Sequence, residues 1–563
     1  MKRVLLLICF CALAFACEKE NTENGGGKDN RPATIVGTVK GDDGSLLKDV
    51  VVSDGLNCVK TDASGRYALP ADLTKTRYVF VSTPAGWAAP VNAGSGMVEF
   101  WKFLSDYKVG ADGKYDIPFT LEKITNPERY TVIIFADPQP RRNDLPTDQY
   151  AFKSLDCCED MYDDMADLVK NMTDRPVYGI ALGDIVHQDL SLLTEYKTGM
   201  ARTGIRTYNI IGNHDHGHRL MADDQSSLEF EKQMGPVNYS FNLGGMHYLM
   251  LDDMISPDPS TQTYSDECGT GLTDEIWEWV KNDMALVPTS TPIMVCAHSP
   301  LFKTLSNNGN EVVIKDRSLT VNHIGDLRNL LSKYSKSYGW AGHTHATFNY
   351  VDKDDKVVEA HTLTRVTGAL WSNDWQGSNG TPRGYVIFEY DNGRISWKFK
   401  PTYYQTGSYQ YSKQPAYDYR PWTYKGGRAY LKNSDGTEGT VQLSDDYQMQ
   451  LYAPGVYGDS YIYANIFMWD ERWGTPIFTT KGVPSPMTRV SDKDKMFSYS
   501  NWELNNFYYK LRNPGLSVFK DEWTHGKNNC ASMFCAFVNE PSGTGTVTVR
   551  DRFGNDYSST ITW

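Results

Sequence analysis

The alternation of hydrophobic and polar positions changes its period twice along the chain. In residues 34–123, short runs such as TIVGTVK, VVVSD and RYVFVST are separated by Gly and Asp turn signals. In residues 128–403, apolar strands alternate with helical patterns, and strand patterns rich in Tyr, Trp, Ser and Gly return in residues 404–563. A period of two indicates strands, whereas apolar residues three and four apart indicate a helix. The chain is therefore predicted to have an N-terminal β-sandwich, a central α/β domain and a C-terminal all-β domain.

The central segment reads as a sheet with helices on both faces. Apolar runs such as YTVIIFAD, VYGIAL, PIMVCA and YGWAG are its strands, and an amphipathic run over about 150–172 is a helix. A second helix is expected at TDEIWEWVKNDM, with Thr273 as its N-cap. Folds of this class bind ligands beyond the carboxyl ends of their strands. The residues that follow the strands are therefore the candidates for a functional site.

Five strand-like runs of this segment end in residues that can coordinate a metal ion. Taken alone, Asp137-Pro138 is an ordinary turn, and one His after a strand is usually a structural, hydrogen-bonded residue. Carboxylate and amide oxygens and imidazole nitrogens, however, are ligands of hard and borderline divalent ions. Five such ends in one domain predict a metal site. They are FADPQ with Asp137 and Gln139, LGD with Asp184, GNHD with Asn213, His214 and Asp215, CAHSP with His298, and GHTH with His343 and His345.

The order of these motifs resembles the calcineurin-like metallophosphoesterase superfamily, whose signature is D-x-H, GD, GNH(D/E), H and GHxH. The resemblance implies a four-layer α/β sandwich of two mixed sheets flanked by helices. The whole chain is similar to Bacteroidetes lipoproteins with β-domains on either side of the catalytic domain, and IVGTVKGDDGSLLKDVVVSDG resembles a transthyretin-like sandwich. The resemblance implies two metal ions that share Asp184. One would be held by Asp137, Gln139, Asp184 and His345, and the other by Asp184, Asn213, His298 and His343.

The implied reaction is hydrolysis of a phosphate mono- or diester by a metal-bridging hydroxide. His214 would protonate the leaving group or stabilise the transition state, and Asp215 would orient its ring. Gln139 replaces the histidine of the family pattern with an amide oxygen. We therefore expect Mn, Mg or Fe ions rather than two Zn ions.

Contacts to the substrate are less constrained by the sequence. Two arginines follow the first ligand loop, where they could pair with phosphate or be solvated loop residues. Two histidines lie close to the GD and GNHD motifs, and a late loop rich in polar and aromatic residues is implied by the resemblance to cap the substrate side. Its tryptophans could equally be structural. The candidates are Arg141, Arg142, His187, His216, Trp371, Asp374 and Arg383.

Charge and cysteine spacing narrow the classes of partner. A formal net charge of -13 disfavours a polyphosphate backbone, so no nucleic acid partner is expected. No C-x-x-C spacing occurs, and a zinc–thiolate site is not supported. The expected partner is a small phosphorylated substrate, and the protein is expected to be a monomer.

The first residues, MKRVLLLICFCALAFAC, have the basic start and short apolar run of a secretory signal. Because Ala16 directly precedes Cys17, residues 1–17 resemble a bacterial lipoprotein signal in which Cys17 is acylated. Residues 18–33 would then be a flexible tether. A plain signal peptide with an incidental cysteine is the alternative. We expect export and a lipid anchor in the outer membrane or at the cell surface, with a periplasm-facing position as the other option.

A surface binding or scaffold lipoprotein with an inactive phosphoesterase core is the contrasting hypothesis. The flanking β-domains and the Gln139 substitution motivate it. The other ligand positions match the family pattern and His214 is retained, so the sequence favours an enzyme.

Overall fold

The computed structural model describes most of the chain, and several predictions fall outside the described ranges. Residues 1–17 with Cys17, most of the predicted tether, and the loop residues Trp371 and Asp374 lie outside them. None of the helices within the ranges is long and apolar enough to cross a membrane. The described residues are 32–93, 95–142, 154–217, 221–256, 268–305, 311–313, 323–351, 358–368, 380–402, 428–432, 438–444, 446, 448–454, 460–490 and 531–563.

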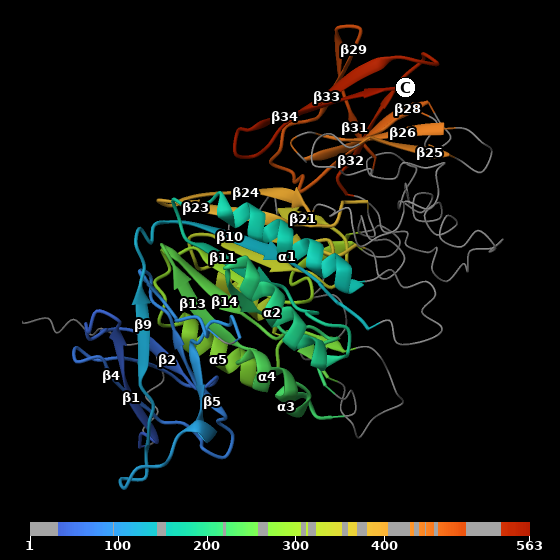
Figure 1. Cartoon of the computed structure of the whole chain (residues 1–563). Helices are drawn as coiled ribbons and strands as arrows, with labels where there is room; N and C mark the ends of the chain where they lie inside the picture. The colour runs from blue at the N-terminus through green and yellow to red at the C-terminus, as the bar shows by residue number, and fades with distance from the viewer. Residues whose placement is uncertain are drawn as a thin grey trace, which may run out of the picture.

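The N-terminal region forms two sheets with a common core (Figure 1). Alternate residues of its first strand are buried, as a strand with one face on a core requires. One sheet contains β1 (Ile35–Gly41), β4 (Arg66–Leu69), β6 (Trp87–Ala88), β8 (Tyr115–Asp116) and β9 (Phe119–Lys123). The other contains β2 (Val51–Ser53), β3 (Cys58–Lys60), β5 (Tyr78–Ser82) and β7 (Trp101–Phe103).

Two mixed sheets form the body of the molecule. The first has the order β12-β11-β10-β23-β24, in which β10, β11 and β12 are parallel. The second has the order β13-β14-β17-β20-β22-β21, in which β14, β17, β20 and β22 are parallel. Their bounds are β10 (Arg129–Phe135), β11 (Val177–Ala181), β12 (Arg206–Asn209), β13 (Tyr239–Leu243), β14 (Met246–Met250), β17 (Ile293–Cys296), β20 (Ser337–Ala341), β21 (Phe348–Val351), β22 (Val358–Thr362), β23 (Gly384–Asp391) and β24 (Arg394–Pro401).

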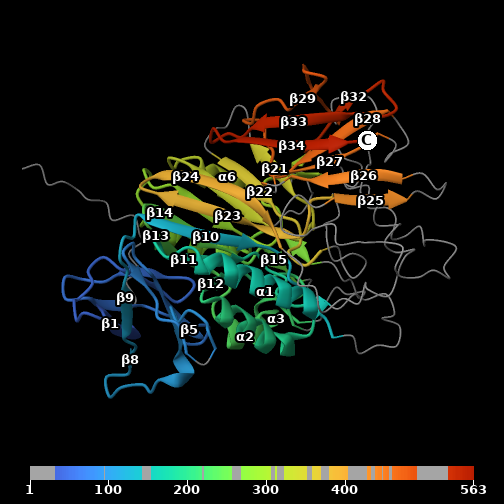
Figure 2. The ribbon, with the colours of Figure 1, turned by 45° about the horizontal axis from the view of Figure 1, so that its top comes forward.

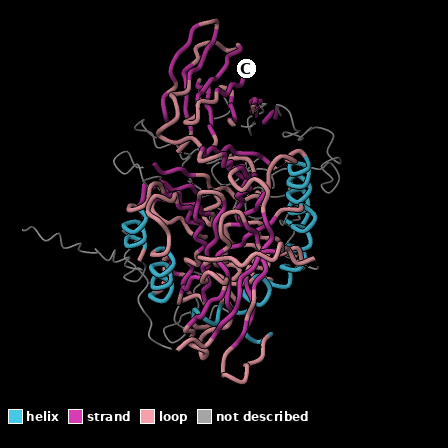
Figure 3. The backbone as a smooth tube through the Cα atoms, turned by 90° about the vertical axis from the view of Figure 1, so that its left-hand side faces the viewer, coloured by secondary structure: helices cyan, strands magenta, loops and turns pink. Residues whose placement is uncertain are grey.

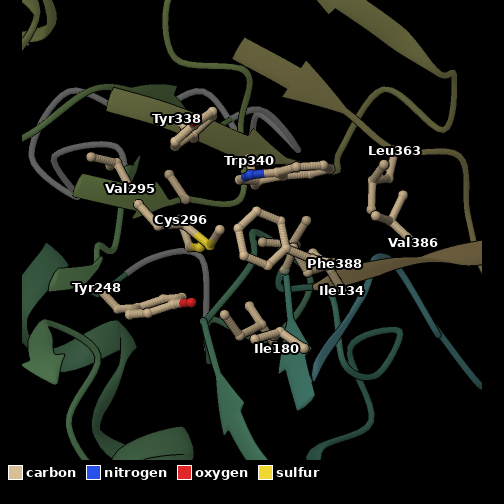
Figure 4. Close-up of a cluster of buried hydrophobic side chains, with 14 of the residues drawn as sticks. Ile134, Ile180, Tyr248, Val295, Cys296, Tyr338, Trp340, Leu363, Val386 and Phe388 are labelled. Carbon is tan, nitrogen blue, oxygen red and sulfur yellow. The ribbon is translucent and has the colours of Figure 1, made fainter. Parts of the chain in front are cut away.

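The two sheets pack face to face through a hydrophobic core. In Figure 4, Ile134, Ile180 and Phe388 of the first sheet lie against Tyr248 and Trp340 of the second. Because side chains alternate along a strand, the neighbours of Ile134 point the other way, into a second cluster with α1 and α2. The apolar runs are therefore buried on both faces, which explains why they read as continuous hydrophobic strands.

Helices lie on both sides of the body strands (Figure 3). The N-cap predicted at Thr273 is present, because its side chain accepts a hydrogen bond from the Ile276 N–H at the start of α5. The helices are α1 (Ser154–Lys170), α2 (Leu193–Thr203), α3 (Asp223–Ser226), α4 (Leu228–Met234), α5 (Asp274–Met284) and α6 (Ile324–Leu331). Short hairpins of β15 (Met254–Ile255) with β16 (Gly269–Thr270) and of β18 (Lys303–Leu305) with β19 (Glu311–Val313) complete this part.

The C-terminal region is again all β. It lies at the end of the body opposite the N-terminal sheets in the views of Figures 1 and 2. One sheet contains β25 (Arg428–Lys432), β26 (Glu438–Leu443), β27 (Met449–Tyr452), β28 (Tyr461–Ile466), β31 (Thr488–Arg489) and β32 (Met533–Phe537), and the other β29 (Ile477–Thr480), β30 (Val483–Pro486), β33 (Thr544–Arg550) and β34 (Asp556–Thr562). The prediction of an α/β body with a β-domain on each side is confirmed.

A buried ion network joins the C-terminal region to the body. Glu359 on β22 is fully buried and pairs with Arg552 at 2.6 Å, Lys336 at 3.0 Å and Arg472 at 3.3 Å. Arg552 also pairs with Asp470 at 2.9 Å. Burial would raise the pKa of Glu359, but the surrounding positive charges hold the pKa at about 2. Because the pKa is lower in the folded protein, the ionised carboxylate stabilises the fold at pH values above 4.5, the usual pKa of a glutamate. This stabilisation is lost as the pH falls toward 2.

Replacing Glu359 with glutamine is expected to reduce the free energy of unfolding at pH 7 by about 3 kcal/mol, because the buried cations lose their counter-charge. Denaturant unfolding of the full chain measures the change. Glu389→Gln is the matched control, since Glu389 is 40% exposed and pairs only at the surface with Arg175. The difference between wild type and Glu359→Gln should shrink as pH falls from 4.5 to 2. Equal effects of the two substitutions at pH 7 would contradict this role.

Candidate metal centre

The candidate ligands meet because their strands run in the same direction. Asp137, Asp184 and Asn213 follow β10, β11 and β12, which are parallel neighbours in the first sheet. His298 and His343 follow β17 and β20, parallel neighbours in the second sheet. The carboxyl ends of parallel strands lie at one edge of a sheet. The two edges therefore present their ligands toward a common region.

Five of the seven predicted metal ligands adopt a left-handed backbone conformation. Their φ angles are 52° at Asp137, 40° at Gln139, 49° at Asp184, 66° at His343 and 55° at His345. Non-glycine residues rarely have positive φ, and each such residue costs of order 1–3 kcal/mol. Such strain persists only where the surroundings enforce it, and it commonly marks a functional site.

Three donor atoms converge on one point at the ends of β12, β17 and β20. Asn213 Oδ1 lies 3.1 Å from His298 Nε2 and 3.0 Å from His343 Nδ1, and the two ring nitrogens lie 3.2 Å apart. His298 Nδ1 lies 2.8 Å from the Leu182 carbonyl, which can only accept a hydrogen bond. This bond fixes the proton on Nδ1 of the neutral ring and leaves the Nε2 lone pair directed at the other two atoms. Three converging lone pairs match the donor set of a divalent cation.

A second group of donors adjoins the first through Asp184. Asp184 Oδ2 lies 3.3 Å from His298 Nε2, and Asp137 Oδ1 lies 3.4 Å from His345 Nε2. Asp137, Asp184 and His298 are all buried, and their ligand atoms lie within 4.8 Å of one another. The Gln139 amide nitrogen donates to Asp184 Oδ2 at 2.6 Å, whereas its Oε1 is buried with no hydrogen-bond partner among the described residues. A cation beside Oε1 would satisfy it, so this donor set also fits a metal ion.

The charges at the site favour a cation. Burial lowers the pKa of His298, but Asp184 more than offsets it and raises the pKa to about 10. Burial would raise the pKa of Asp184, yet the same pairing holds that pKa well below its usual value. Burial, assisted by His298, lowers the pKa of His343 to about 4. His343 is thus neutral and able to coordinate at neutral pH, and a metal ion would displace the proton of His298.

His214 stands at the rim of this centre. Its side chain is 19% exposed, its Nε2 lies 4.0 Å from Asp184 Oδ2, and its backbone N–H donates to Asp184 Oδ1 at 2.8 Å. The His187 ring packs on it with a centroid distance of 4.2 Å. Burial and the nearby charge of His214 lower the pKa of His187 to about 3, so His187 is neutral. His214, predicted to be catalytic, and His187, predicted to contact the substrate, therefore lie beside the ligand cluster.

Asp215 has a role in the structure that the sequence did not predict. Both of its carboxylate oxygens are engaged by backbone N–H groups, those of Ile185, Val186 and Gly212, each at 2.9 Å. Asp215 therefore ties the loop after Asp184 to the loop that carries Asn213. Orientation of the His214 ring by Asp215 stays a prediction. Sequence alone could not distinguish these roles, because either is served by an acid next to a histidine.

Asp215→Ala should consequently lower both stability and activity. Three buried N–H groups would lose their acceptor, and an unsatisfied buried donor costs about 1–3 kcal/mol. We expect a loss of at least about 2 kcal/mol in the free energy of unfolding, together with weaker metal binding. Chemical denaturation, metal titration and a phosphate ester hydrolysis assay of the same sample measure these effects. A loss of activity with unchanged stability would instead favour the originally predicted role.

Three other predicted substrate contacts are engaged elsewhere. Arg142 pairs at the surface with Asp189 and Glu195, Arg383 is 1% exposed and pairs with Asp160 on α1, and His216 is buried against Ser226 and Asp252. These are the side-chain partners that the described residues show for them, and their roles as substrate contacts stay predictions. Arg141 is half-buried, with its backbone N–H bonded to Ser154. Burial is the main cause that lowers the pKa of His187, and the charge of Arg141 contributes to the same shift.

Sequence reasoning missed two residues that hold the first ligand loop. Arg365 and Thr367, just after β22, donate hydrogen bonds to the main chain of residues 137–139. Ala136 and Arg365 also form a parallel bridge between the two sheet edges. The available signal was an arginine at the end of an apolar strand. It could have indicated a buried cation, but it did not indicate which loop that cation would contact.

Comparison with known proteins identifies the family. The N-terminal model of calcineurin-like phosphoesterases matches residues 33–123, and the C-terminal model matches residues 361–557, from within β22 to within β34. Purple acid phosphatase 15 of Arabidopsis thaliana is 28% identical over 149 residues, which are 24% of this chain and 24% of the plant protein. The chain thus covers about a quarter of that relative's length.

Two solved structures are more distant. Purple acid phosphatase PPD1 from yellow lupin (Lupinus luteus) has a TM-score of 0.35 and 12% identity, over 64% of this chain and 73% of that one. PhoD has a TM-score of 0.32 and 10% identity, over 73% and 86%. The two family models, by contrast, match both flanking regions and the last strands of the body. On these matches, and with its motifs in the predicted order, the chain belongs to the calcineurin-like phosphoesterase superfamily.

Proposed function

We propose that this protein hydrolyses phosphate mono- or diesters with two divalent metal ions. The observation that carries the proposal is the convergence of Asn213 Oδ1, His298 Nε2 and His343 Nδ1 at 3.0–3.2 Å, next to the buried carboxylates of Asp137 and Asp184. Such a set of converging oxygen and nitrogen donors with buried negative charge matches what a divalent cation requires.

The residues divide into two overlapping ligand sets. Asp137, Gln139, Asp184 and His345 would hold one ion, and Asp184, Asn213, His298 and His343 the other. Bound there, the ions would activate water and neutralise charge on the phosphoryl oxygens. The amide oxygen of Gln139 favours Mn, Mg or Fe over a pair of Zn ions.

His214 is the proton donor of the proposed reaction. Its partial exposure leaves the ring accessible to a substrate, and its Nε2 lies 4.0 Å from Asp184 Oδ2, next to the proposed ligands. His187 packs against it and limits the orientations of the ring. Together they would hold a proton where an alkoxide leaving group develops.

The proposal also includes the detailed domain folds, the localisation, the oligomeric state and the substrate class expected from the sequence. The body would be the four-layer sandwich of this superfamily, and the N-terminal sheets would have the transthyretin-like arrangement. The protein would be an exported lipoprotein anchored through Cys17 and would act as a monomer on a small phosphorylated substrate. The net charge of -13 argues against a nucleic acid substrate.

The test is hydrolysis of chromogenic phosphate mono- and diesters by the full-length protein after removal of metals with a chelator. We expect no turnover by the stripped protein and recovery on addition of Mn²⁺, with Mg²⁺, Fe²⁺ and Zn²⁺ tested in parallel. Full activity without metal would contradict the proposal. Inactivity with every metal and every ester would favour the scaffold hypothesis instead.

A further inference from the structure

Arg365 occupies an uncommon position for a buried arginine. It is fully buried, and within the described part of the chain its hydrogen bonds all go to main-chain carbonyls. Nε donates to the Asp137 carbonyl at 3.0 Å, and Nη2 donates to those of Pro138 and Gln139 at 3.2 Å and 2.8 Å. A buried arginine is ordinarily paired with a carboxylate. Here the guanidinium donates hydrogen bonds to three successive main-chain carbonyls of one ligand loop.

That loop needs an external support. Asp137 and Gln139 both have positive φ, and Pro138 between them has no N–H with which to brace a turn. Thr367 Oγ1 adds a hydrogen bond to the Pro138 carbonyl at 2.9 Å, and the Val366 N–H bonds the Ala136 carbonyl at 2.9 Å. The segment after β22 therefore fastens the whole Asp137-Pro138-Gln139 loop. The planar fork of arginine can reach several carbonyls at once, which the compact ammonium of lysine cannot do in the same geometry.

We propose that Arg365 is a positioning residue of the metal centre, which holds Asp137 and Gln139 in their strained conformation and thereby sets the affinity of the ion that they bind. The inference rests on the proposed function, because it takes Asp137 and Gln139 as ligands. The change in metal affinity expected from it is opposite to the change that electrostatics alone would give. A guanidinium close to a cation site repels the cation, so loss of this charge alone would strengthen metal binding. Loss of the support for the loop would instead weaken metal binding.

The sign of the change in metal affinity therefore separates the two effects. We would titrate metal-stripped, full-length wild type, Arg365→Lys and Arg365→Gln with Mn²⁺. The heat of binding and the spectroscopic signal of Mn²⁺ would be measured. Both variants are expected to bind one of the two ions 10–100-fold more weakly, the usual effect of removing support from a ligand. Arg365→Lys keeps the charge, so its weakening isolates the loss of the fork. Unchanged or tighter binding in both variants would overturn the proposal.

Two further variants guard against misfolding as an explanation. Thr367→Val removes only the bond to the Pro138 carbonyl and should weaken the same ion by a smaller factor. Arg383→Lys is the matched control, because Arg383 is equally buried but pairs with Asp160 on α1. It should lower the unfolding temperature and leave Mn²⁺ affinity unchanged. Equal losses of Mn²⁺ affinity in Arg383→Lys and Arg365→Lys would overturn this inference and leave the proposed function standing. A wild-type protein that binds no Mn²⁺ would overturn both.

Discussion

Asp184→Asn is expected to lower kcat/KM for phosphate ester hydrolysis by about 10³-fold or more, equivalent to roughly 4 kcal/mol of transition-state stabilisation. Asp184 is the residue that joins the two donor groups, since its carboxylate contacts both Gln139 and His298. The substitution conserves shape but removes the negative charge that a shared ligand between two cations requires. We therefore expect weaker binding of both ions, measured by metal titration alongside steady-state kinetics.

The exposed carboxylate of Asp167 supplies the control for this experiment. Asp167 lies on α1 with its side chain 60% exposed, so Asp167→Asn should leave activity and metal content unchanged. A single cooperative transition in the thermal unfolding of metal-free Asp184→Asn would show that the variant is folded. If Asp184→Asn retained wild-type turnover with both ions bound, Asp184 would not be the shared ligand.

His214→Ala should produce the second largest effect and leave the metal centre in place. General acid catalysis by a positioned histidine typically contributes about 10²- to 10⁴-fold, and we expect kcat to fall by that factor. Because His214 Nε2 is 4.0 Å from Asp184 and is not among the converging donors, metal content should be preserved. The loss should be smaller for esters with good leaving groups, which need less protonation.

His323 offers a comparison for His214→Ala. It pairs with Asp274 and Asp326 at the start of α6 and contacts none of the proposed ligands in the described structure. His323→Ala should therefore leave kcat unchanged. A similar loss for good and poor leaving groups in His214→Ala would assign its imidazole to charge stabilisation rather than proton donation. Full activity of His214→Ala would exclude it from the reaction.

The sequence was most informative about residues that follow strands. Asp137, Asp184 and His298 could be recognised because strand direction alone brings such positions to one edge, whatever the details of packing. The left-handed backbone at Asp137 and Gln139 could not be predicted, since neither residue is a glycine and no local pattern requires positive φ. That conformation is enforced by Arg365, more than two hundred residues away in sequence.

Roles of charged side chains were the least predictable part of the site. Arg142 and Arg383 lie in loops that suggest phosphate binding, yet their partners are Asp189 and Asp160, on elements far away in the sequence. A guanidinium pairs with whichever carboxylate the tertiary fold brings near, and sequence spacing does not contain that information. Asp215 illustrates the same limit at short range, because its partners are backbone groups of two different loops.

The most direct test of the account is the number of divalent ions that the full-length wild-type protein binds after it has been stripped of metal. Equilibrium titration with Mn²⁺ should saturate at two ions per chain, and phosphoesterase activity should appear as the second ion binds. Binding of no ion or of a single ion at saturation would contradict the dinuclear centre proposed at the ends of β10, β11, β12, β17 and β20.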